Sequence, residues 1–221
     1  FYVHEPDSAA SLDAVPLLAA AEDGVTARGA ILEFVRSAMG ARSDRVTGKL
    51  PLFPKAYFGP GAYPLKRAAV LSAKALGKAG LRISIPNMVP WSESGAVRLV
   101  WKSIESLGRL PALLHALPEA RAVHIVRHPC GYAASVLRGE AEHRFGSTVG
   151  ASEDYGIFRL LLGTRAARRY ELDETRLSKL SAVERLAWRW ALFNEHVMEE
   201  WSDRERLRMV RYEDLCMDPQ G

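Results

Sequence analysis

Arg127 is the residue whose type and position in this sequence best suit a chemical role. It follows the apolar run 122–126, which predicts a buried strand, and it precedes Pro129, which suits the first turn of a helix. Ligands of parallel α/β sheets collect at the carboxyl ends of strands, where a guanidinium can donate two parallel hydrogen bonds to a phosphate. Ser135 follows eight residues after Arg127, as a second ligand or as a small packing residue.

The segments around Arg127 alternate as in a parallel sheet. Strands are expected at 1–4, 96–104, 122–126 and over the stretch RLRMVRYEDL, 206–215. Helices are expected at 11–24 (whole or broken), 24–44 with a stop at Gly40, 65–80, 105–120 (interrupted), 154–170 and 180–201. This order predicts an α/β fold in one domain, residues 1–221, with a parallel sheet and flanking helices.

Two of these segments also predict buried residues. The nearly continuous apolar run of Val123, Ile125 and Val126 is typical of an interior parallel strand. The helix expected at 180–201 has one apolar face, which predicts core positions at Val183, Leu186, Trp190, Phe193 and Val197.

The composition is that of an ordinary globular protein and limits the possible partners. A net charge of +4 favours anionic ligands, but no basic stripe or recognised module indicates nucleic acid. The two cysteines, Cys130 and Cys216, form neither a CxxC pair nor a Cys/His cluster, so we expect no metal site and a reducing, cytoplasmic location. No apolar run reaches the roughly 18 residues that a membrane helix needs.

Four segments resemble the sulfotransferase family. The stretch VHIVRHPCGYAASVLRG, with a serine eight residues after the strand-end arginine, is similar to the segment of that family that binds a nucleotide 3′-phosphate. The stretches FYVHEP, VRLVWKSI and VRYEDLCMDP resemble three further segments, and all four lie in the order of the family. Together they span almost the whole chain and are closest to bacterial and carbohydrate-type members.

The resemblance implies a fold, a co-substrate and residues to bind it. The fold would be a three-layer parallel sheet with flanking helices, like that of P-loop NTPases and incomplete at both ends. Arg127 and Ser135 would bind the 3′-phosphate of PAPS (3′-phosphoadenylyl sulfate), and PAP would be the product. Tyr212 would approach the adenine, or be an ordinary strand-end tyrosine. We expect Glu213 and Asp214 to hold the strand end and neighbouring backbone.

The resemblance also implies residues for the chemical step. A sulfonate group would pass from PAPS to a hydroxyl or amine acceptor on a glycan, small molecule or protein. Lys102, 25 residues before Arg127, would contact the sulfonate and the bridging oxygen, or extend into solvent from the surface. The base histidine of cytosolic members is replaced by Ile104. Glu5 matches the glutamate base of carbohydrate-type members, and could instead be structural.

One part of the expected binding site has no counterpart here. The glycine- and serine-containing loop that binds the 5′-phosphate in the family should precede FYVHEP, and RVTGKL (45–50) is too late to be that loop. We therefore expect a fragment of a sulfotransferase that binds PAP weakly or not at all by itself. The alternative is a degenerate, non-catalytic binding module. A kinase-type enzyme would need the loop GxxxxGK[ST], which the chain lacks.

Other segments carry weaker expectations. Residues 48–64 and 139–155 are expected to be irregular and to shape the acceptor pocket. His124 is expected to be a packed residue of its strand, and His128 replaces the usual Asp or Asn of the family. A basic helical cluster could face an acidic acceptor such as a glycan or be a solvated surface. It comprises Arg165, Arg168 and Arg169.

Overall fold

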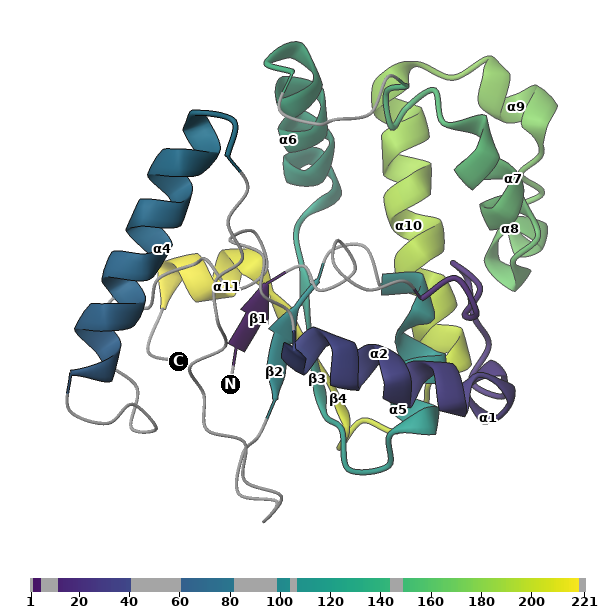
Figure 1. Cartoon of the computed structure of the whole chain (residues 1–221). Helices are drawn as coiled ribbons and strands as arrows, with labels where there is room; N and C mark the ends of the chain where they lie inside the picture. The colour runs from purple at the N-terminus through teal and green to yellow at the C-terminus, as the bar shows by residue number, and fades with distance from the viewer. Residues whose placement is uncertain are drawn as a thin grey trace. The chain divides into compact units, whose positions relative to one another are not determined.

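The computed structural model describes residues 2–4, 12–40, 61–81, 99–103, 107–143 and 149–218. Helices and parallel strand pairs give a mixed α/β structure, as expected (Figure 1). The chain divides into two compact units. The first comprises Phe1–Val15 and Ala27–Leu107, and the second comprises Pro16–Thr26 and Gly108–Gly221. A single domain over residues 1–221 stays a prediction.

The first unit contains a parallel strand pair. Strand β1 (Tyr2–His4) pairs with β2 (Val100–Lys102) so that Tyr2 lies opposite Val100 and His4 opposite Lys102. Both strands fall inside the expected segments, although β2 is shorter than the predicted run 96–104. The parallel pairing brings the carboxyl ends of β1 and β2 to the same edge.

Two long helices belong to the first unit. Helix α2 (Arg28–Gly40) buries Ile31, Phe34 and Ala38 on one face, and the Phe34 ring meets Trp101 edge-on at 6.4 Å. Helix α4 (Ala62–Lys78) begins inside the segment 48–64 that we expected to be irregular. That expectation is wrong for residues 62–64, because Pro64 lies in the first turn of the helix, where its missing N–H costs nothing.

The segment 12–26 runs from the end of Phe1–Val15, in the first unit, into the second unit, and its prediction was largely wrong. Residues 12–22 form mostly turns and bends, and helix α1 (Asp23–Thr26) overlaps the expected helix 11–24 only at its last two residues. Pro16 cannot donate a helical hydrogen bond, and Asp23 Oδ2 accepts the N–H of Ala20 at 2.8 Å. This local bond offers the backbone an alternative to a helix.

The second unit contains the other parallel pair. Strand β3 (Ala122–Val126) matches its predicted bounds and pairs along its length with β4 (Leu207–Arg211). On one face, His124 Nε2 lies 2.7 Å from Asn194 Oδ1. On the other face, Val123 and Ile125 are 64% and 53% exposed. Since β4 is the only strand beside β3 among the described residues, an interior position for β3 stays a prediction.

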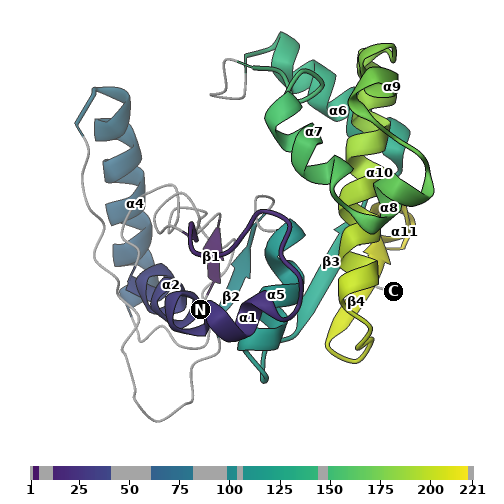
Figure 2. The same ribbon diagram turned by 90° about the vertical axis from the view of Figure 1, so that its right-hand side faces the viewer.

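The described part of the second unit contains nine helical elements besides this strand pair. After α1, they are the 3-10 turn η2 (Leu107–Arg109), which starts at the unit boundary, α5 (Leu110–Ala116), α6 (Pro129–Ala141), α7 (Tyr155–Leu162), α8 (Arg165–Arg169), α9 (Glu174–Ser178), α10 (Ala182–Glu200) and α11 (Tyr212–Met217). Figures 1 and 2 show α6 and α10 side by side, with α7, α8 and α9 along α10.

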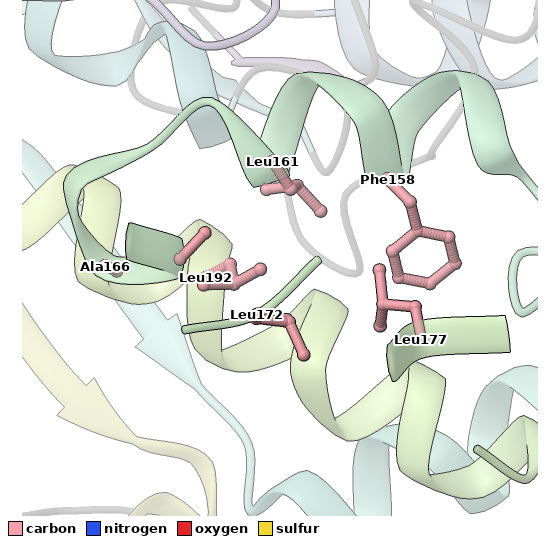
Figure 3. Packing of buried hydrophobic residues seen from close by; sticks show 7 residues of the cluster. Phe158, Leu161, Ala166, Leu172, Leu177 and Leu192 are labelled. Atoms are coloured by element: carbon pink, nitrogen blue, oxygen red, sulfur yellow. The ribbon is translucent and has the colours of Figure 1, made fainter. Parts of the chain in front are cut away.

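Helix α10 organises the core of the second unit. It begins with a reciprocal capping box between Ser181 and Glu184. Its apolar face joins α7, α8 and α9 in a cluster drawn in Figure 3, which comprises Phe158, Leu161, Ala166, Ala167, Leu172, Leu177 and Leu192. Leu186 and Val197 are buried as predicted, whereas Val183, in the first turn, is 51% exposed and Leu192 is core instead. The core prediction for Val183 was wrong.

Candidate functional site

The carboxyl ends of β3 and β4 lie next to each other. In the parallel register, Val126 is opposite Arg211, so Arg127 and Tyr212 leave the sheet from the same edge. The sequence separates them by 85 residues, and only the strand pairing brings them together. This edge is where the general rule for parallel sheets places a ligand.

The guanidinium of Arg127 lies over the ring of Tyr212. The guanidinium carbon of Arg127 lies 5.2 Å from the centre of the Tyr212 ring, within the range of a cation–π contact. Both side chains are exposed, Tyr212 by 43%. Within the described residues, Arg127 forms no ion pair, so its planar set of N–H donors is available to an anion from solution.

The Tyr212 phenol is held in its neutral form. The side chain of Cys216, one helical turn further along α11, raises the pKa of Tyr212 above its usual value, and the nearby charge of Arg127 opposes this only in part. The ring beneath the guanidinium is therefore uncharged at neutral pH. The neutral Tyr212 phenol therefore does not offset the positive charge of Arg127.

The amino end of α6 begins directly beside the guanidinium. His128 is the N-cap residue, and its Nδ1 accepts the N–H of Cys130 at 3.3 Å. The histidine thus performs the capping that an Asp or Asn would perform at this position. Pro129 occupies the first helical position, as predicted, and Gly131 supplies the next backbone N–H. The helix dipole adds positive potential at this end.

Glu213 ties the two strand ends together. Its Oε1 accepts the backbone N–H of His128 at 3.0 Å, and Asp214 forms an ion pair with Arg211. The predicted roles of Glu213 and Asp214 at the strand end are confirmed by these contacts. The hydrogen bond from His128 and that from the backbone of Glu213, aided by the charges of His128 and Arg127, lower the pKa of Glu213.

This lowered pKa predicts how acid weakens the strand ends. The stabilisation from ionised Glu213 is complete above the carboxyl pKa of the unfolded chain, about 4.3, and is lost as the pH falls through the lower folded value. Glu213→Gln should therefore melt below the wild type at neutral pH. The difference should shrink below about pH 4, in a series of thermal melts. A difference that stays constant with pH would contradict this account.

Ser135 lies on the face of α6 over which Arg127 extends. A Cβ atom built on Gly131 would meet Arg127 Nε at 2.9 Å, so the arginine side chain lies across the bare backbone of Gly131. Ser135 is four residues further along α6, one helical turn above Gly131 on the same face. It is exposed, so its hydroxyl is accessible beyond the arginine.

The two predicted catalytic residues are not joined to this site by the structure. Lys102 is the exposed last residue of β2, in the first unit, at the strand end where the sequence placed it. Glu5 lies outside the described residues. Their roles therefore stay predictions.

The three arginines of α8 all have partners within the protein, and two of them are paired with glutamates. Arg165 pairs with Glu200, and Arg169 pairs with Glu195 and with Glu199. Arg168 donates to the carbonyl of Gly163 at 2.7 Å. This confirms the interpretation of the cluster as a solvated face.

His124 is the packed residue that its strand position predicted. It is half-buried, and burial lowers the pKa of its imidazole, against which the hydrogen bond with Asn194 acts. The imidazole is therefore mainly neutral at neutral pH.

The segment that follows α6 is anchored by residues that the sequence did not single out. Glu140 accepts the N–H of Ala151 at 2.6 Å, and Arg189 donates to the carbonyl of Ala151 at 3.0 Å. The buried Arg185 donates to the carbonyl of Ser152 at 2.8 Å and pairs with Glu153. Residues 149–154, within the expected acceptor loop 139–155, are thus held by α6 and α10.

No protein-family model, no curated protein and no solved structure matches this chain. In the described part of the chain, no helix has the length and apolar character to cross a membrane. The same residues contain no group of three or more His, Cys, Asp or Glu side chains arranged to hold a metal ion. The proposed function therefore depends on the site itself and on the sequence resemblance.

Proposed function

We propose that this chain is a PAPS-dependent sulfotransferase domain whose β3–α6 and β4–α11 junctions bind the nucleotide 3′-phosphate. The observation that carries the proposal is the exposed guanidinium of Arg127, which forms no ion pair among the described residues and lies over the Tyr212 ring beside the amino end of α6. A dianionic phosphate fits this donor set, because it can accept bidentate bonds from the arginine and a bond from a first-turn amide. Ser135 would add its hydroxyl from the next turn.

The resemblance supplies the rest of the proposal, including a three-layer parallel sheet. An acceptor oxygen or nitrogen would attack the sulfur, forming a new bond to sulfur while the bond to the phosphate oxygen breaks. Glu5 would take the acceptor proton, and the Lys102 ammonium would stabilise the negative charge that develops on the bridging oxygen. PAP would leave. The acceptor would be a hydroxyl or amine of a glycan, small molecule or protein.

The test uses two nucleotides that differ in the position of one phosphate. Adenosine 3′-monophosphate carries the group that Arg127 would bind, and adenosine 5′-monophosphate does not. We expect the isotope-labelled chain to bind the first weakly, with a Kd on the order of 1 mM, and the second at least several-fold more weakly. Chemical shift changes should centre on residues 127–135 and on Tyr212. Equal binding of both nucleotides, or no binding, would overturn the proposed 3′-phosphate site.

Catalysis needs its own assay. The full gene product that contains this chain should transfer radiolabelled sulfonate from PAPS to an acceptor mixture, and Lys102→Ala should reduce the rate by roughly 100-fold, the cost typical of losing a transition-state charge contact. Selective binding of adenosine 3′-monophosphate without any transfer would instead support the non-catalytic binding module.

A further inference from the structure

We propose that Tyr212 and Gly131 act together as positioning residues that hold the Arg127 guanidinium between them, ready for a phosphate. This inference rests on the proposed 3′-phosphate site and assigns two residues a role that the resemblance does not give them. The sequence predicts that Tyr212 either approaches the adenine or is an ordinary strand-end tyrosine, and it predicts no role for Gly131.

Tyr212 supports one side of the guanidinium. The ring lies 5.2 Å from the guanidinium carbon. It belongs to α11, which follows β4, whereas Arg127 precedes α6, which follows β3. A cation–π contact holds the guanidinium over the ring without using its N–H donors, so they remain available to an anion. The ring thus restricts rotation of the side chain without consuming a hydrogen bond.

Gly131 leaves space for Nε, Cδ and Cγ of the Arg127 side chain. A Cβ atom at this position would lie 2.9 Å from Nε and 3.5 Å from Cγ and Cδ of Arg127. These atoms contact the backbone of α6 only because residue 131 has no side chain. The obstruction would fall on the flexible end of the arginine rather than on the backbone, so Gly131→Ala should move the guanidinium and leave the helix intact.

The local structure does not require either residue for folding. Tyr212 is 43% exposed, and alanine is a better helix former than glycine, so the fold gains little from a tyrosine or a glycine at these positions. A phenol hydroxyl is also unnecessary for stacking. The proposal therefore predicts that phenylalanine replaces Tyr212 well and that leucine does not.

The first experiment measures binding of adenosine 3′-monophosphate and thermal stability in parallel. Gly131→Ala and Tyr212→Leu should each weaken binding about two- to fivefold, as expected for losing a cation–π contact or its geometry, while Tyr212→Phe should bind like the wild type. The melting temperature of Gly131→Ala should be unchanged or higher. Gly77→Ala, in α4 with open space around the new Cβ, is the matched control and should leave binding unchanged.

The second experiment follows the Nε–Hε resonance of Arg127 in isotope-labelled protein without nucleotide, assigned by its loss in Arg127→Lys. Stacking should shift this proton through the ring current; Tyr212→Leu should remove the shift, Gly131→Ala should change it, and Tyr212→Phe should keep it. Unchanged resonances in all three variants would overturn the positioning proposal. The expected resonance changes without nucleotide binding by the wild type would instead overturn the 3′-phosphate site and leave the positioning intact.

Discussion

Replacing Arg127 by alanine should abolish the preference of this chain for adenosine 3′-monophosphate over the 5′-isomer. The Arg127 guanidinium can donate two parallel, charge-assisted hydrogen bonds to a phosphate. It forms no ion pair within the described residues, whereas Arg211 at the end of β4 is paired with Asp214. Losing those bonds should weaken binding by at least roughly 10- to 100-fold, since a single hydrogen bond to a charged group contributes about 1.5–3 kcal/mol. Titration by nuclear magnetic resonance measures the change.

Two control variants separate this role from general charge. Arg138→Ala removes the same charge from the exposed opposite end of α6 and should change binding less than twofold, within the range expected of a screened surface charge. Arg127→Lys keeps the charge without the planar fork and should recover only part of the affinity. Equal losses in Arg127→Ala and Arg138→Ala would show that only net charge attracts the nucleotide, contrary to the proposal.

Replacing Phe158 by alanine should lower the free energy of unfolding of the second unit by about 3–5 kcal/mol, the usual cost of emptying a fully buried aromatic site. Phe158 is completely buried in the cluster of α7, α8, α9 and α10 (Figure 3). Urea unfolding followed by tryptophan fluorescence suits this test, because Trp188 packs against the same cluster.

Val183→Ala is the control for Phe158→Ala. The apolar pattern of α10 predicts that Val183 is core, whereas the structure leaves it 51% exposed in the first helical turn. Its truncation should change the free energy of unfolding by less than about 0.5 kcal/mol. A loss near that of Phe158→Ala would contradict the packing described for α10.

Elements defined by local rules were predictable, and elements governed by competing contacts were not. The strand Ala122–Val126 is bounded by polar residues and Pro129, and α10 begins at a capping box, so both could be located from neighbouring residues alone. Residues 12–22 are apolar enough for a helix, but Pro16 and the Asp23 side chain favour turns there. Periodicity does not reveal which interaction prevails.

Individual residues of the candidate site could be predicted from the sequence, but the contacts between them could not. Arg127 could be chosen from its place after an apolar run, and the capping position of His128 from the proline that follows. The stack on Tyr212 depends on parallel pairing across 85 residues, which no local pattern specifies. Gly131 did carry a signal, since a glycine in the first turn of a helix is unfavourable unless its missing side chain serves a purpose.

The hydrogen bond between His128 and Glu213 has a consequence for the order in which the protein is made. Its two partners are 85 residues apart, so a ribosome releases the β3 side of the site well before β4 exists. During that interval, the emerging strand lacks its neighbour and displays Val123 and Ile125 beside an unpaired edge, which favours association with other chains. Such distant pairing also folds slowly. Synthesis at reduced rate, or with chaperone, should therefore improve the yield of this protein more than that of a helical protein of equal length.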